Sequence, residues 1–297
     1  MATMHSVTWH GTLHLASSLA HGGKSAGNLE PFRRETLILP TGQRLSGIPM
    51  VSGGGIRGAL RRVASEVYHR ALTDASGTLP MIAVNAIRSG GALRETRTDD
   101  VLTAERQAAI RDLCPMLAIF GTTGPGRIMS GRLIVDKGIP LTRETLPFAP
   151  DGLDVYTDTL PSIREIVQHE TFTRVADIQT AAGIALVDNP AEVPPTNTTD
   201  MFFTVETLMA GTHLLHSISL EAATPLEIAF MDDVMGLWQR TARIGAHRSR
   251  GLGKVTPRYT RAVTDLAGRP AKNPKLPDWE AYTRDNRDRI LAALTCL

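Results

Sequence analysis

Two segments rich in glycine and arginine carry the residue types that bind phosphate groups, although they lie far apart in the sequence. We call residues 52–58, Ser-Gly-Gly-Gly-Ile-Arg-Gly, the first glycine segment, and residues 244–254, Ile-Gly-Ala-His-Arg-Ser-Arg-Gly-Leu-Gly-Lys, the late loop. Glycine lets a backbone approach a ligand closely, and arginine and serine donate hydrogen bonds to phosphate oxygens. Each segment adjoins a predicted helix end, where backbone groups are free to bind ligands. The pattern predicts a site for a polyphosphate chain, which we interpret as RNA.

Residues of these two segments and of two further turns, near residues 21 and 127, are predicted to contact the RNA. The alternatives are a solvated helix face for the arginines after the first glycine segment, a flexible basic loop, an ordinary turn near residue 21 and a surface charge at residue 127. The predicted contacts are His21, Lys24, Ser25, Ser52, Gly54, Gly55, Arg57, Arg61, Arg127, His247, Arg248, Ser249, Arg250 and Lys254.

No complete catalytic motif accompanies these residues. The sequence has no HExxH or GxSxG pattern, no carboxylate pair in a glycine frame and no Cys/His pairing. Lys24 and Ser25 follow glycines as in a P-loop, but Ser18 stands where that motif needs glycine. His213 and His216 have the spacing of metal ligands on a helix, yet they lie in a strand-like run that turns them to opposite faces. We expect no metal and no cofactor.

The composition is that of a globular protein whose charge is distributed locally. Hydrophobic residues make up 42% of the 297 residues, enough for a sizeable core, and the net charge of +2 is too small for a protein that coats DNA. Acidic residues gather around 95–105 and 151–170, so basic surface can concentrate elsewhere. The chain has no apolar run of membrane length. We expect a cytoplasmic protein without membrane contact.

Hydrophobic spacing predicts the elements that position the two segments. Strict alternation predicts a first strand at 7–15, and a 3.6-residue period predicts helices at 56–67 and from 225 onward. Residues 73–100 read as irregular. The other predicted elements are a helix at 103–119 interrupted by Pro115, a turn at 124–127, strands at 128–135, 202–205, 214–220 and 254–259, a hairpin at 172–187 and a terminal helix at 278–294. This order predicts an α+β, ferredoxin-like core with long insertions.

With these elements in place, the chain resembles the RAMP superfamily of CRISPR-associated proteins, and within it the Cas-seven-like backbone subunits. Residues 41–62, 173–194 and 243–254 carry the resemblance, and the first glycine segment is most similar to that of type IV effector complexes. The resemblance implies one domain with an RNA-recognition-motif-like palm, a thumb that includes Arg174 and Ile178 as RNA contacts, and a helical finger insertion. The implied boundaries within 1–297 are palm at 5–72, 126–141 and 201–262, helical insertion at 73–125, thumb at 142–200 and C-terminal extension at 263–297.

The resemblance also implies a function. Relatives stack head to tail along CRISPR guide RNA, display it for pairing with target nucleic acid, and join other subunits in an antiviral ribonucleoprotein. Type III relatives carry a catalytic aspartate after the first strand, but the corresponding residues 27–31 contain only Glu30. We therefore expect a scaffold that cuts no target. Two alternatives remain: an endoribonuclease that processes guide RNA with His69 or His21 and uses Lys24 or an arginine to stabilise charge, and a nucleotide-binding enzyme.

Overall fold

A computed structural model describes residues 3–23, 27–73, 77–91, 102–124, 126–150, 153, 159–174, 201–295 and 297. It is a mixed α+β fold with antiparallel sheets. The strands are β1 (His5–Leu15), β2 (Leu29–Glu30), β3 (Arg34–Ile38), β4 (Arg44–Pro49), β5 (Thr122–Gly124), β6 (Arg127–Met129), β7 (Leu133–Val135), β8 (Ile139–Pro140), β9 (Val167–Arg174), β10 (Met201–Leu208), β11 (His213–Ala223) and β12 (Val255–Thr264). The α-helices are α1 (Gly53–Leu72), α2 (Met81–Arg88), α3 (Ala104–Leu113), α4 (Pro115–Phe120), α5 (Pro225–Thr241), α6 (Trp279–Asp285) and α7 (Arg287–Thr295).

The main sheet has the strand order β12-β1-β11-β7, and β8 also pairs with β11. β1 lies inside it and pairs antiparallel with both β11 and β12 along most of its length. The predicted alternation is confirmed, because Val7, Trp9, Leu13 and Leu15 are all buried on one face. β12 runs on to Thr264, beyond the predicted end at 259.

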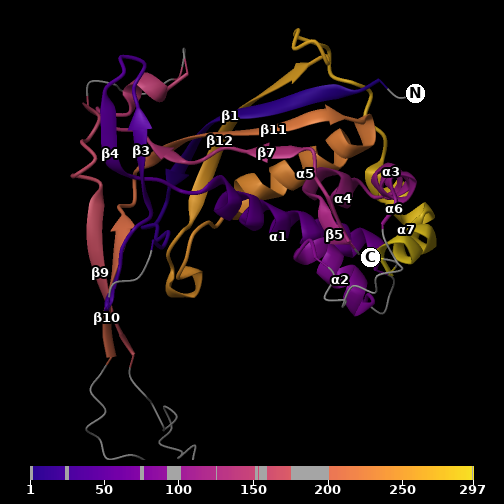
Figure 1. Ribbon diagram of the computed structural model, residues 1–297, viewed down its shortest axis with the longest axis horizontal. Coiled ribbons are helices and arrows are strands. Elements are labelled where there is room, and N and C mark those ends of the chain that lie inside the picture. Colours follow the sequence, from indigo (N-terminus) through magenta and orange to yellow (C-terminus); the bar gives the residue numbers. More distant parts are fainter. Residues whose placement is uncertain are drawn as a thin grey trace, which may run out of the picture.

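Helices α1 and α5 run along the buried face of this sheet (Figure 1). Both begin at well-formed caps: the Ser52 hydroxyl accepts a hydrogen bond from Gly55, and Thr224 forms a reciprocal capping box with Glu227. Their apolar faces meet where the Tyr68 and Phe230 rings lie 5.5 Å apart. The main sheet and these two helices therefore support both the first glycine segment, which leads into α1, and the late loop, which follows α5.

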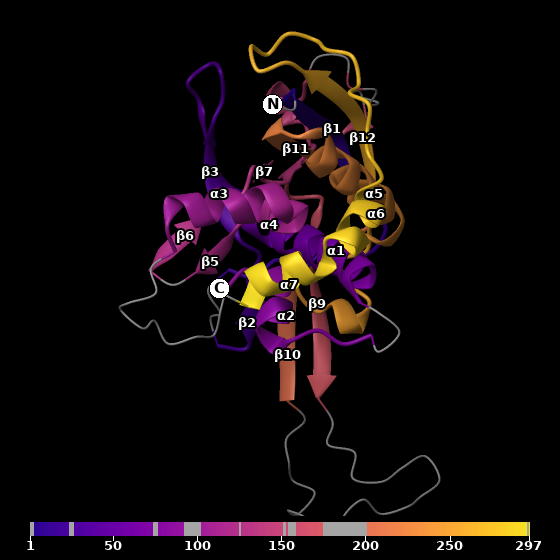
Figure 2. The ribbon, with the colours of Figure 1, turned by 90° about the vertical axis from the view of Figure 1, so that its right-hand side faces the viewer.

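Helices α2, α3 and α4 and the C-terminal helices α6 and α7 gather at one end of this helix layer (Figure 2). The predicted break at Pro115 is confirmed, since this proline opens α4. Two expectations were wrong: residues 81–88 form α2 where irregular structure was expected, and the terminal helix is divided at Asn286 into α6 and α7. No helix in the described part of the chain is long and apolar enough to cross a membrane.

A two-stranded ribbon of β9 and β10 projects from the other end, with the short β2 parallel to β10 (Figure 1). The predicted hairpin at 172–187 is corrected in part, because β9 pairs with β10. The remainder of that hairpin, including Ile178, lies outside the described residues. Arg174 is the last residue of β9, opposite Met201.

Candidate nucleic-acid interface

His21 connects the loop after β1 to the first glycine segment. Its Nε2 accepts a hydrogen bond from the Ser52 backbone N–H at 3.0 Å, directly before α1 begins. Burial lowers the pKa of His21, and the positive charge of Arg33 lowers it further, so the ring remains a neutral acceptor near pH 7. A Cβ on Gly55 would lie 3.0 Å from the His21 ring. His21 and Gly55 therefore shape the start of α1, while Gly54 is exposed with open space around its Cβ position.

The late loop packs against the same stretch of chain. The Ala246 N–H donates to the Ala20 carbonyl at 2.8 Å. Gly245 has a φ of +76°, and a Cβ there would lie 2.2 Å from the Ala20 oxygen, so this contact requires glycine. The late loop and the first glycine segment therefore contact neighbouring residues, Ala20 and His21. That the two segments form one RNA-binding surface stays a prediction.

Charges on α1 and the late loop also affect one another. Burial lowers the pKa of Arg62, and the nearby positive charge of Arg248 lowers it further. Two guanidinium groups that repel each other in this way mark a surface where an anion would be stabilised.

Arg61 is not part of that surface, contrary to expectation. Its side chain is only 7% exposed, and burial lowers its pKa to about 10. The guanidinium donates to backbone carbonyls at the ends of α2 and α4, where helices leave such groups without partners. These acceptors are the oxygens of Ala86, Ile87, Phe120 and Gly121, at 2.8–3.0 Å. Arg61 thus holds two inserted helices against α1.

Arg57 is intermediate in exposure between the buried Arg61 and the exposed Arg248. It is half-buried, donates to the Phe120 carbonyl at 2.7 Å and has its guanidinium carbon 5.9 Å from the Phe120 ring centroid. One of its nitrogens is therefore already used within the protein. Arg127 is exposed but lies on β6 in the inserted helical region, where its charge acts on Glu105 (Figure 2). The structure does not bring Arg127 to the late loop.

An open groove of about 770 Å³ runs beside the late loop. Arg248, Ser249 and Arg250 form an exposed 3₁₀ turn between two left-handed residues, His247 at φ 53° and Gly251 at φ 91°. Within the described part of the chain, neither arginine of this turn nor Lys254 forms an ion pair. The groove is lined by Gly27, Asn28, Phe203 and residues 245–250. The two arginines that line the groove, Arg248 and Arg250, are therefore available to a ligand.

Four predicted contacts lie outside the described residues or lack a described side chain. Lys24 and Ser25 fall between the described ranges 3–23 and 27–73, and Ile178 falls beyond β9. The backbone of Arg174 is described, but its side chain is not.

The late loop is fastened to the β9–β10 ribbon by contacts that sequence reasoning missed. Phe172 and Phe203 face each other across the ribbon, with ring centroids 5.6 Å apart. The Arg250 guanidinium carbon lies 4.5 Å from the Phe203 centroid and 5.1 Å from that of Phe172. His247 stacks on Phe172 and bonds through Nε2 to Glu30 at 2.9 Å. We call Phe172, Phe203, His247 and Glu30 the ribbon anchor.

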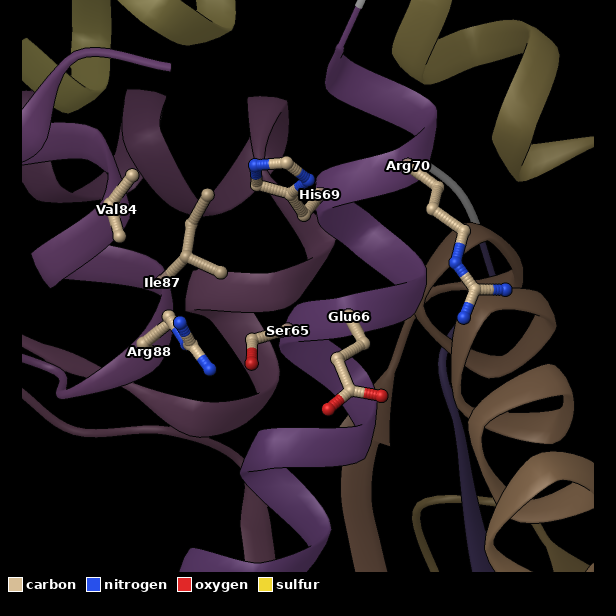
Figure 3. A pocket seen from close by; sticks show the side chains of 7 residues that line it. All are labelled: Ser65, Glu66, His69, Arg70, Val84, Ile87 and Arg88. Carbon is tan, nitrogen blue, oxygen red and sulfur yellow. The ribbon is translucent and has the colours of Figure 1, made fainter. Parts of the chain in front are cut away.

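A second cavity, of about 300 Å³, lies between α1 and α2 and includes His69 (Figure 3). His69 is in the last turn of α1, whereas His21 bonds to Ser52 at its start. About 25 Å of helix separates the two histidines, at 1.5 Å for each residue. One active site cannot use both.

Comparison with known proteins gives a likeness of fold. No known family model and no curated protein matches the chain. A chain of the solved structure described as "Type IV-B CRISPR Complex" matches with a TM-score of 0.56 and 23% sequence identity. The match covers 93% of this chain and 96% of that chain. The two chains therefore share a fold over nearly their whole lengths.

Proposed function

We propose that this protein is a non-catalytic, RNA-binding scaffold subunit of a CRISPR effector complex, which polymerises head to tail along guide RNA. The observation that carries the proposal is the groove beside the late loop, whose arginines form no ion pair in the described part of the chain, together with the contacts of the late loop and of the first glycine segment to Ala20 and His21. The likeness to a chain of a type IV-B CRISPR complex supports the same assignment.

We infer that the main sheet is the palm. Its order β12-β1-β11-β7, with α1 and α5 as the crossover helices, is the order of a split β-α-β, ferredoxin-like unit. In this interpretation α2, α3 and α4 belong to the finger insertion, and the β9–β10 ribbon is the stem of the thumb. The groove then lies where palm and thumb meet.

RNA affinity in this proposal comes from phosphate contacts by Arg248, Arg250 and Lys254. Such contacts carry little sequence information, so the protein binds guides of any sequence and loses affinity steeply as salt rises. Target choice then rests on base pairing by the guide. Head-to-tail contacts between copies, which do not close into a ring, extend the assembly along the RNA.

The geometry around Glu30 supports a role without target cleavage. This carboxylate is engaged by His247 and holds the late loop in place. The endoribonuclease alternative would have to use His21 or His69, and the Nε2 of His21 already serves as the acceptor for the start of α1.

Purification followed by a salt titration tests the proposal. The scaffold copurifies with RNA tens of nucleotides long, with several protein copies on each RNA. Replacing Arg248, Arg250 and Lys254 together with alanine lowers the slope of log affinity against log salt by about 2, at about 0.7 for each lost contact to single-stranded RNA.

The matched control replaces three exposed arginines on the inserted and C-terminal helices, Arg106, Arg284 and Arg289, and removes the same charge. An equal loss in both triple variants would show that only overall charge matters. Multiple-turnover cleavage of repeat RNA that disappears in His21→Ala or His69→Ala would instead identify a nuclease. A melting temperature raised by a mononucleotide, with no response to RNA, would identify the nucleotide-binding alternative.

A further inference from the structure

The Arg250 guanidinium lies against two aromatic rings. The guanidinium carbon lies 4.5 Å from the centroid of Phe203 and 5.1 Å from that of Phe172. A planar guanidinium stacks favourably on an aromatic face. The two phenylalanines come from paired strands and lie at 29° to each other, so they form a continuous support.

Hydrogen bonds restrain the same side chain. Arg250 Nη1 lies 3.4 Å from His247 Nδ1, and His247 Nε2 lies 2.9 Å from a Glu30 oxygen. Since Arg250 can only donate, Nδ1 is the acceptor, and Nε2 then carries the proton that it donates to Glu30. The ribbon anchor therefore holds the Arg250 guanidinium beside the two rings.

Open space lies in front of this restrained group. Arg250 is exposed, and it lines the 770 Å³ groove together with Phe203. Gly27 and Gly245 contribute no side chains to that groove, whose volume is in the range of small-molecule sites. The groove therefore offers room beside Arg250 for a planar ligand.

We propose that Arg250 is a stacking site for one nucleobase of the bound RNA, in the order Phe203, guanidinium, base. This inference rests on the proposed function and adds a base contact to it. Single-stranded RNA is commonly held by stacking of its bases on aromatic rings and arginine planes. Because every base has a π-face, this contact keeps binding independent of sequence.

The neighbouring cations complement this arrangement. Arg248 lies two residues away in the same 3₁₀ turn, and no aromatic ring contact to it is seen in the described residues. Arg248 and Lys254 therefore remain free to bind phosphate. Part of the Arg250 donor edge is turned to His247, so the rest of that edge meets phosphate while the flat face of the guanidinium meets a base.

Arg250→Lys tests the proposal because it keeps the charge and removes the plane. Fluorescence anisotropy with the full chain compares an oligouridine of about eight nucleotides with an abasic oligomer of the same length and charge, within the range of single-stranded sites. Wild type binds oligouridine about tenfold more tightly than the abasic oligomer, as expected for one stacked base. This ratio falls toward one in Arg250→Lys, and also in Phe203→Leu.

Arg248→Lys is the matched control for the ratio: it makes the same change in the same turn and preserves the preference for oligouridine. Wild type that binds both oligomers equally, or an Arg250→Lys variant that keeps the full preference, would overturn base stacking and leave the scaffold proposal standing. Wild type that binds neither oligomer nor longer RNA would overturn both proposals. The Arg250→Lys result decides the matter even if Phe203→Leu fails to fold.

Discussion

Arg61 on α1 has its guanidinium buried among backbone carbonyls, whereas Arg250 on the late loop keeps its guanidinium in solvent on two phenylalanine rings. Both segments are rich in glycine and arginine, and both were expected to contact RNA. The groups around each arginine decide its use. Helix ends left without partners draw Arg61 inward, while apolar rings satisfy one face of Arg250 and leave the rest of it open.

Arg61→Ala gives the largest expected effect. It removes four hydrogen bonds to backbone carbonyls, of which, in the described part of the chain, only the Phe120 oxygen keeps another donor, Arg57. At about 1 kcal/mol for each bond, the free energy of unfolding falls by about 4 kcal/mol. Urea denaturation followed by circular dichroism measures this loss. Arg250→Ala is the matched exposed variant and changes the free energy of unfolding far less. Equal urea midpoints for Arg61→Ala and wild type would show that the hydrogen bonds of Arg61 do not make it more important for stability than Arg250.

Histidines on β11 extend the contrast between buried and exposed groups. His216 is buried and its Nδ1 lies 2.7 Å from the Tyr259 hydroxyl, whereas His213 lies on the opposite face against His14, as the strand period predicted. Burial lowers the pKa of His216 to about 4. As the pH falls from 6.5 to 4, the unfolded chain takes up a proton at this site that the folded chain does not, so stability falls.

His216→Gln tests this dependence. The change removes up to about 3 kcal/mol of the loss in unfolding free energy between pH 6.5 and pH 4. Denaturant melts at both pH values measure it, and His10→Gln is the matched exposed control. A pH dependence that stays the same in His216→Gln would show that this ring does not contribute to acid sensitivity.

Substitutions at two glycines of the late loop are expected to lower the stability less, and their difference separates backbone strain from a packing clash. Gly245 and Gly251 both have positive φ, but only Gly245 packs against Ala20; a Cβ at Gly251 meets nothing within 4 Å. Gly251→Ala therefore costs about 1 kcal/mol of backbone strain. Gly245→Ala adds a clash, costs more than about 2 kcal/mol and displaces the loop. Thermal melts and RNA titrations measure both variants, and equal costs would argue against the contact with Ala20.

Glu30→Ala has the smallest expected effect. The change frees His247, loosens the Arg250 guanidinium and weakens RNA binding a few-fold, by about 0.5–1 kcal/mol for one lost hydrogen bond. Filter binding measures it. We expect that neither wild type nor Glu30→Ala cuts paired target RNA. Cleavage by wild type that is lost in Glu30→Ala would make this carboxylate catalytic and would contradict the scaffold assignment.

The elements built from local periodicity could be predicted from the sequence. β1, α1 and α5 each carry a long apolar pattern, and the residues that cap the two helices stand where the rules expect them. α2 could not be predicted because its eight residues contain only one short buried stripe, Ala83, Ala86 and Ile87. Its burial depends on neighbouring helices.

In the candidate site, too, features that depend on local sequence could be predicted and features that depend on distant contacts could not. The convergence of the two segments was predicted from phosphate chemistry, and the exposed cations of the late loop agree with it. The burial of Arg61 depends on which helices cover that side of α1, and the pairing of Phe172 with Phe203 joins strands far apart in the chain. Neither is encoded in local spacing.

Arg61 also has a consequence for how the molecule unfolds and evolves. Because one guanidinium closes the ends of both α2 and α4 from a residue of α1, the insertion and the helix beneath the sheet share one set of bonds. We expect them to melt in a single cooperative transition. In a chimera that replaced α2, α3 and α4 by a shorter connection, the Arg61 guanidinium would lose its carbonyl acceptors. Residue 61 would then have to change as well.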